Sequence, residues 1–208
     1  MTDTATAPAT APTATRKGEQ TRRAILEAAI ARFGRDGYRA TSVADIARDA
    51  GVSGTAAYAY FPNKEALFRD AVDVDAAELV NVGLDHVATS TAATWHESVL
   101  FAVAAAIDHH PLARRLLAGL EPEVTERVLD VPALADLRQA TIDRIRQEQA
   151  AGTARTDIDA ASVGNGLIAI ILSLLMSLVQ VGGDAASTYA ADISSVFAAA
   201  LVPIAPPG

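Results

Sequence analysis

Apolar residues recur every three or four positions along most of the chain, a spacing typical of amphipathic helices. The first such stripe lies between about Glu19 and Arg35, and it carries Ile25, Leu26, Ala29, Ile30 and Phe33. Similar stripes run through about 64–87, 98–107, 112–120, 133–151, 160–182 and 185–202. No stretch alternates apolar and polar residues over a convincing length. The pattern therefore predicts an all-α fold.

Residues 42–65 predict two short helices joined by a tight turn and followed by the start of a third. Ala47 is small enough for two helices to cross there, and Gly51 accepts a left-handed backbone without a Cβ penalty. The side chains placed to cap these helices are Thr41, Ser42, Ser53 and Asn63. Such a unit presents its second helix, here about 53–60, to the major groove of DNA.

The formal net charge of −8 argues at first against a nucleic-acid partner, but the charge is unevenly distributed. Residues 1–70 contain 10 Lys and Arg against 8 Asp and Glu, whereas residues 71–208 contain 7 against 17. The positive excess thus lies where a DNA-facing surface needs it. Cysteine is absent, which excludes a disulfide framework and a thiolate metal site and fits a reducing cytoplasm.

The pattern divides the chain into three parts. Residues 1–17 are rich in Thr, Ala and Pro and lack the apolar segment of a secretory signal, so we expect a disordered tail. Its end, Arg16-Lys17, is either a flexible arm toward a DNA backbone or part of a solubilising leader. Residues 18–63 form the predicted helix-turn-helix domain. Residues 64–205 form a helical domain whose first helix follows directly from it.

Residues 160–183 are uncharged and long enough to span a bilayer. Small or polar residues nevertheless recur along one face, and they are Ser162, Asn165, Gly166, Ala169, Ser173, Ser177 and Gln180. The other face is aliphatic. Such a helix suits burial between two protein layers, with its small face against a close-packed partner helix. We expect a soluble helical dimer rather than a membrane protein.

The most specific signal is a register of about fifty residues, from Thr21 to Asp70. It reads TRRAILEAAIARF, then G-Y-x-A-T-S-V-x-D-I-A, then A-G-V-S, then Y-x-Y-F-P-N-K-E-A-L-F. In this register the chain resembles the N-terminal domain of the TetR/AcrR family of bacterial transcriptional regulators. The resemblance implies a cytoplasmic homodimer that binds a pseudo-palindromic DNA operator, most often as a repressor, and is released by a small-molecule effector.

The resemblance also implies DNA contacts. They fall on Thr41, Ser42, Ser53, Gly54, Thr55, Tyr58, Tyr60 and Lys64. Thr41 or Ser42, together with Ser53 and Lys64, are expected at phosphates. Thr55 is expected at a base, Tyr58 at the backbone or a base, and Tyr60 either at a phosphate or in the core. Many relatives have K-G-T-L-Y-Y-H-F after the serine, where this chain has G-T-A-A-Y-A-Y-F. Fewer long donors leave more of the specificity to backbone contacts and DNA shape.

In the rest of the chain, the resemblance implies an effector cavity among about 80–155 and dimerisation through about 158–202. Trp95, Phe101, Leu116 and Leu117 would suit an apolar or aromatic ligand, although core packing accounts for them as well.

Other classes of function find little support in the sequence. His109 and His110 are adjacent and point apart on a helix, and no carboxylate or second imidazole lies at ligand spacing from His86 or His96. We therefore expect no catalytic site, metal or cofactor. The alternative that stays open is a helical ligand-binding or adaptor protein of the same fold that has lost specific operator binding.

Overall fold

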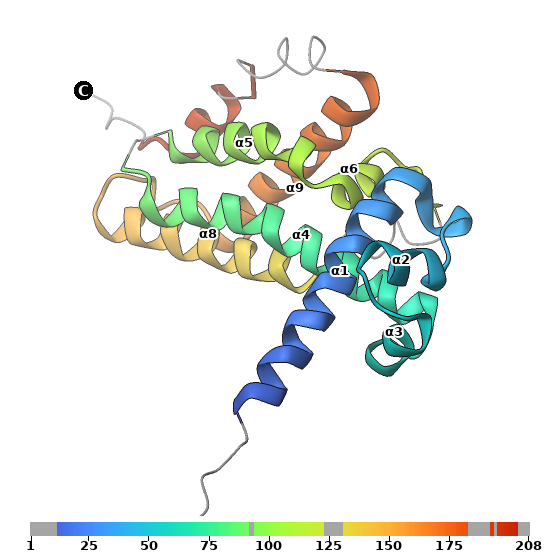
Figure 1. Cartoon of the computed structure of the whole chain (residues 1–208). Coiled ribbons are helices and arrows are strands. Elements are labelled where there is room, and N and C mark those ends of the chain that lie inside the picture. Colours follow the sequence, from blue (N-terminus) through green and yellow to red (C-terminus); the bar gives the residue numbers. More distant parts are fainter. Residues whose placement is uncertain (1–11, 92–93, 123–130, 183–191, 194, 204–208) are drawn as a thin grey trace, which may run out of the picture. The chain divides into compact units, whose positions relative to one another are not determined.

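The computed structural model of the chain describes residues 12–91, 94–122, 131–182, 192–193 and 195–203, and these contain helices and no strand (Figure 1). The elements are α1 (Pro12–Ala40), α2 (Val43–Asp49), α3 (Gly54–Tyr60), α4 (Lys64–Thr89), α5 (Trp95–Ala106), a 3₁₀ turn η1 (Ile107–His109), α6 (Pro111–Leu117), α8 (Pro132–Ala150) and α9 (Ala160–Val181). Residues 195–201 are also helical. The predicted all-α fold is confirmed.

The chain divides into two compact units, residues 1–71 and 72–208, so the division falls inside α4. The sequence predicts a domain boundary at 63/64, where α4 begins. The first turns of α4 pack in the core of the first unit. Leu67 and Ala71 are fully buried, and the ring of Phe68 lies edge-on to that of Phe33, with 4.9 Å between the centroids.

Helix α1 begins at Pro12, so residues 12–17 of the predicted tail are helical. Arg16, Lys17, Glu19 and Gln20 all have good helix propensity, which favours extension of the helix toward the N-terminus. Residues 1–11 lie outside the described part of the chain. At the other end of α1, Gly37 adopts φ 82°, a left-handed value that breaks the helical geometry three residues before Ala40.

The core of the first unit forms where α1, α2, α3 and the start of α4 meet. Ile25, Phe33, Ile46 and Phe61 are at most 1% exposed. Ala47 is buried at the crossing of α2 with its neighbours, and Gly51 has φ +69° in the turn between α2 and α3. The predicted helix-turn-helix scaffold is therefore present, with both special positions in their predicted roles.

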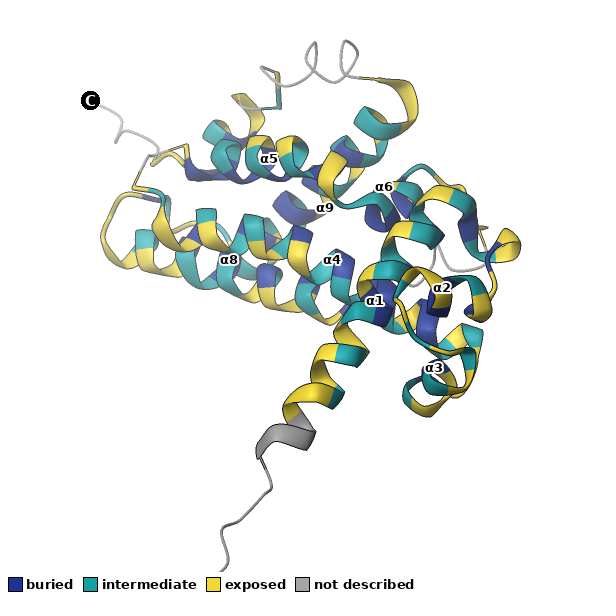
Figure 2. Cartoon of the chain, viewed as in Figure 1, coloured by how far each residue is buried: buried dark blue, intermediate teal, exposed yellow. Residues whose placement is uncertain are grey.

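The second unit is built on α8 and α9, which pack along each other and are joined by the remaining helices around one apolar core. The approach is close at Gly164, where a Cβ atom would lie only 2.8 Å from Cγ1 of Ile142. On the other side of α8, the Arg144 guanidinium donates to the carbonyl oxygens of Val87 and Ser90, at and just beyond the end of α4. Figure 2 shows how buried residues line the facing sides of these helices.

Candidate nucleic-acid interface and ligand cavity

Helix α2 starts at a side-chain cap. Ser42 Oγ accepts the backbone N–H of Asp45 at 3.2 Å and donates to Asp45 Oδ2 at 2.6 Å, so the two residues hold each other in place. The hydrogen bond from Ser42, followed by that from Arg48, holds the pKa of Asp45 below its ordinary value. Ser42 stays exposed, which leaves the start of α2 open to a ligand from solution.

The next two helices are capped in the same way. Ser53 Oγ accepts the backbone N–H of Ala56 at 3.1 Å at the start of α3, and Asn63 Oδ1 accepts that of Ala66 at 2.8 Å at the start of α4. Each cap satisfies an N–H group that has no partner within its helix. The predicted capping roles of Ser42, Ser53 and Asn63 are confirmed.

Thr41 differs from its neighbour Ser42. It is 3% exposed and its hydroxyl donates to the carbonyl oxygen of Gly37 at 2.8 Å. The hydroxyl therefore stabilises the break at the end of α1 rather than facing solvent. Of the two hydroxyls that the sequence predicts at this phosphate position, the structure exposes that of Ser42.

Helix α3 presents an uncharged surface, since its sequence GTAAYAY contains no acidic or basic residue. Thr55 is exposed, and the side chain of Tyr58 is among the exposed large apolar groups, at 54%. No atom lies within 4 Å of a Cβ added at Gly54, so another backbone has room to approach there. Tyr60 is half-buried, between the two roles that the sequence leaves open.

Lys64 lies in the first turn of α4, where the positive end of the helix dipole adds to its charge. Its Nζ is 4.4 Å from the centroid of the Tyr38 ring and 3.5 Å from the carbonyl oxygen of Arg39. The ring holds the ammonium group without neutralising it. The contact with Tyr38 was not predicted, because the two residues are 26 positions apart.

Several arginines of the first unit are engaged by carboxylates. Arg32 makes two hydrogen bonds to Asp49, of 2.6 and 3.0 Å, and these tie α1 to α2. They raise the pKa of Arg32 and lower that of Asp49. Arg22 pairs with Asp70 at 2.6 Å. Part of the positive charge in this unit is therefore paired with carboxylates within the unit.

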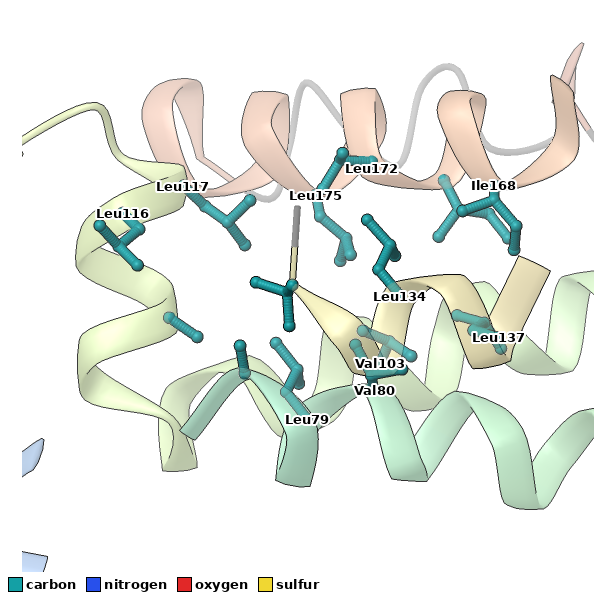
Figure 3. A pocket seen from close by; sticks show the side chains of 14 residues that line it. Leu79, Val80, Val103, Leu116, Leu117, Leu134, Leu137, Ile168, Leu172 and Leu175 are labelled. Atoms are coloured by element: carbon teal, nitrogen blue, oxygen red, sulfur yellow. The ribbon is translucent and has the colours of Figure 1, made fainter. Parts of the chain in front are cut away.

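The second unit contains a cavity of about 70 Å³ among α4, α5, α6, α8 and α9 (Figure 3). The described residues that line it are Ala76, Leu79, Val80, Val103, Ala113, Leu116, Leu117, Val131, Leu134, Leu137, Ile168, Ile171, Leu172 and Leu175. All have aliphatic side chains. In Figure 3 the leucines of α4, α6, α8 and α9 point toward one another across the cavity.

The four residues that the sequence suggests as ligand contacts do not lie together in the structure. Leu116 and Leu117 lie on the cavity wall, whereas Trp95 is 2% exposed in the core and Phe101 is 56% exposed on the outside of α5. The wall also extends beyond the expected range 80–155, because α9 and the middle of α4 contribute to it. The 3–4 spacing of apolar residues on these two helices was visible in the sequence, but not which positions face a common space.

The histidines do not gather. Within the part of the chain that the structure describes, no three His, Asp or Glu side chains lie close enough to hold a metal ion.

A comparison with protein-family models matches residues 25–71 to the family described as bacterial regulatory proteins, tetR family. The matched residues include all of α2, the turn at Gly51 and α3, and they end in the first turns of α4. Residues 25–71 therefore match the DNA-binding domain of the tetR family, whose members are described as bacterial regulatory proteins. This match supports a DNA-binding transcriptional regulator.

Several solved structures share the fold over most of the chain. Salmonella enterica GusR aligns with a TM-score of 0.66 and 21% identity over 87% of this chain and 95% of its own. A TetR transcriptional regulator from Chloroflexus aurantiacus gives 0.69 and 21% over 90% and 98%. A γ-butyrolactone receptor gives 0.59 and 22% over 90% and 91%. A comparison with curated protein sequences gave no match.

The two parts of the chain differ in what they match. The family model covers the helix-turn-helix unit, and the helical unit that follows shares its fold with the solved structures.

Proposed function

We propose that this chain is a TetR-family regulator that binds a pseudo-palindromic operator as a homodimer in the cytoplasm, represses transcription there, and is released by a small-molecule effector. The observation that carries the proposal is the exposed, capped helix α3, with Thr55 and Tyr58 facing solvent. In a dimer, two such helices would enter successive major grooves about 34–36 Å apart.

The individual contacts follow from the side chains. Ser42 and Ser53 are exposed hydroxyls at helix starts, and Lys64 is a cation at a third, so these three are proposed to bind phosphates. Thr55 is proposed to contact a base and Tyr58 the DNA backbone or a base, and the open space at Gly54 lets the DNA backbone come close. Tyr60 lies at the rim of this surface. Thr41 acts indirectly, through its bond to Gly37.

The experiment is a titration of DNA from upstream of the protein's own gene, followed by fluorescence anisotropy at several salt concentrations. Tyr58→Ala and Lys64→Ala are each expected to weaken binding about tenfold or more, and Lys64→Ala also to lower the salt slope by about one. Arg146→Ala, which removes one exposed positive charge from the second unit, is the matched control. Unchanged affinity in both test variants would show that the interface is misplaced.

A second candidate is a ligand-binding or adaptor protein of the same fold without specific operator binding. The uncharged sequence of α3 favours it, since that helix offers few long donors for bases. A folded dimer that binds this DNA and an unrelated sequence equally well, at every salt concentration, would support this candidate over the first.

The proposed dimer forms through α9 and the helical residues after it. The face of small and polar residues predicted on α9 is exposed in the single chain, and Ala169, Ser173 and Ser177 line a shallow hollow there together with Ile193. Although α9 is long and apolar enough by composition to cross a membrane, an exposed face of Ser, Asn and Gln suits a protein partner better than lipid. Of the proposed interface 158–202, residues 183–191 and 194 are not described.

Ser173→Arg tests the dimer by placing a large charged side chain on this face. We expect monomers in sedimentation velocity, while Ala135→Arg at an exposed position of α8 leaves the dimer intact. A dimer that survives Ser173→Arg would move the interface elsewhere.

The proposed effector binds in the aliphatic cavity and acts through α4, which starts in the DNA-binding unit and lines the cavity with Ala76, Leu79 and Val80. An effector that favours a second position of α4 would shift the population toward dimers whose reading helices no longer match the operator. The similar fold of a γ-butyrolactone receptor supports a ligand-receiving role. Effector binding without any change in DNA affinity would contradict this mechanism.

A further inference from the structure

We infer that the cavity of the second unit selects an uncharged hydrocarbon group, either a whole ligand of this kind or the apolar end of a larger one. The inference rests on the proposed function, in which this unit receives the effector. It adds the chemical class of the ligand of this chain, which the description of the matched family does not specify.

The first argument is the chemistry of the wall. Every described residue that lines the cavity is Ala, Val, Leu or Ile, from five different helices and the residue that precedes α8 (Figure 3). A charged or hydrogen-bonding group that entered would lose its water and find no partner among these side chains. An alkyl or aryl group loses nothing there and is removed from water, which favours its binding.

The second argument is that the polar groups bordering the wall are already engaged. Gln180 donates to the carbonyl oxygen of Leu117 at 2.8 Å. Arg115, beside Leu116, donates to Glu121 at 2.7 Å, and both side chains are largely buried. A ligand that needed either group would first have to break a partly buried hydrogen bond.

The third argument concerns Asp75, which could attract a cationic ligand because it precedes Ala76 on α4. Its Oδ2 accepts the backbone N–H groups of Leu112 and Ala113 at 3.0 and 2.7 Å, and its Oδ1 lies 3.1 Å from Nδ1 of His110. Leu112 and Ala113 belong to α6, and His110 directly precedes it. The Asp75 carboxylate is thus already hydrogen-bonded at the start of α6. It would repel an anionic ligand in the cavity.

The size of the cavity adds a requirement for movement. An apolar cavity of about 150 Å³ is known to hold benzene, so the 70 Å³ present here is too small for a ring without displacement of the wall. Leu79 and Val80 on α4 and Leu116 on α6 are among the side chains that must give way. Entry of a hydrocarbon ring would therefore push on α4, the helix shared with the DNA-binding unit.

The experiment compares three probes of one shape, toluene, benzoate and benzylammonium, with the full-length dimer at pH 7.4. Binding is measured by calorimetry and by methyl NMR shifts of the protein. Toluene is expected to bind saturably and at least tenfold more tightly than either ion. Tighter or equal binding of benzoate or benzylammonium would overturn the inference, and so would the absence of toluene binding up to its solubility limit.

Two variants show whether toluene occupies this cavity. Ala76→Leu fills it from α4 and is expected to weaken toluene binding at least tenfold, and the milder Val80→Leu serves if the first variant does not fold. Ala135→Leu makes the same change as Ala76→Leu on the exposed face of α8 and should leave binding unchanged. Toluene binding that ignores both cavity variants would overturn the assignment to this cavity.

The readout needs no DNA, so this inference and the proposed function fail separately. Toluene binding in the cavity with no loss of operator affinity would leave the ligand class standing and contradict release by the effector. Operator binding together with tighter binding of an ionic probe would leave the proposed operator binding standing and contradict the ligand class.

Discussion

Two helix junctions of the second unit each bury an ionisable side chain to the same degree. They differ in whether that side chain is hydrogen-bonded. Asp75, at the junction of α4 with α6, and His96, at the junction of α5 with the helical residues 195–201, are both 2% exposed. Asp75 has three donors within 3.1 Å. Neither ring nitrogen of His96 has a hydrogen-bond partner among the described residues.

The difference follows from what each junction has to hold. Helix α6 begins with Pro111 and has no cap of its own, so the carboxylate from α4 takes the N–H groups that a capping side chain would normally accept. His96 instead packs edge-on against Trp95 and Phe197, with ring centroids 5.7 and 5.2 Å away. The first junction depends on the acceptor oxygens of Asp75, and the second depends on an uncharged ring.

Removal of the carboxylate is expected to have the largest effect. Asp75→Ala leaves two backbone N–H groups and the His110 donor without their acceptor, and we expect the free energy of unfolding to fall by about 3 kcal/mol. The measurement is urea unfolding at a fixed protein concentration, because dimerisation makes stability depend on concentration.

Two further variants show whether the loss comes from the cap. Asp75→Asn keeps one acceptor oxygen and is expected to lose about half as much as Asp75→Ala. Asp85→Ala removes an exposed carboxylate from the same helix and should stay within about 0.5 kcal/mol of the wild type. Equal losses in the alanine and asparagine variants would mean that packing, not hydrogen bonding, makes Asp75 important.

The caps of the two units also differ in whether they could be predicted from the sequence. The caps at Ser42, Ser53 and Asn63 and the turn at Gly51 were predicted correctly because each depends on residues within a few positions. The cap at Asp75 joins residues 37 and 38 positions apart, and nothing local marks it as different from an exposed aspartate.

The candidate sites divide in the same way. The exposed side of α3, the helix proposed to face DNA, follows from the positions of its residues, since Ala57 is buried and Thr55 and Tyr58 lie outside. The cavity could not, because its wall is assembled from positions on five helices that are apolar in any case. Phe101 has the composition of a pocket residue but lies on the outer side of α5, and only tertiary packing decides that.

Acid is expected to weaken the second junction and to have the next largest effect. Burial holds the pKa of His96 below its ordinary value, although Glu97 on α5 and Glu148 on α8 act in the opposite direction. In the unfolded chain the same ring titrates near pH 6.5, so below that pH the unfolded state binds the proton more readily. The free energy of unfolding should therefore fall as the pH drops from 7 to 5, by up to about 1.4 kcal/mol per unit from this group.

His96→Leu tests this assignment, since it removes the titration and keeps an apolar side chain of similar volume. The variant should lose stability less steeply than the wild type between pH 7 and pH 5. His109→Leu makes the same change at an exposed histidine and should keep the wild-type pH dependence. Identical pH profiles for His96→Leu and the wild type would show that another group controls acid stability.

The smallest expected effect on the free energy of unfolding comes from His110, which pairs with Asp75 at the junction of α4 with α6. His110→Ala removes one donor to Asp75 but leaves the two backbone N–H groups in place, so we expect a loss of only about 1 kcal/mol. If the two side chains act together, the double variant with Asp75→Ala should be little worse than Asp75→Ala alone, because the partner of His110 is then already missing. Losses that simply add would show that His110 stabilises the start of α6 independently. The carboxylate would then hold that start through the backbone alone.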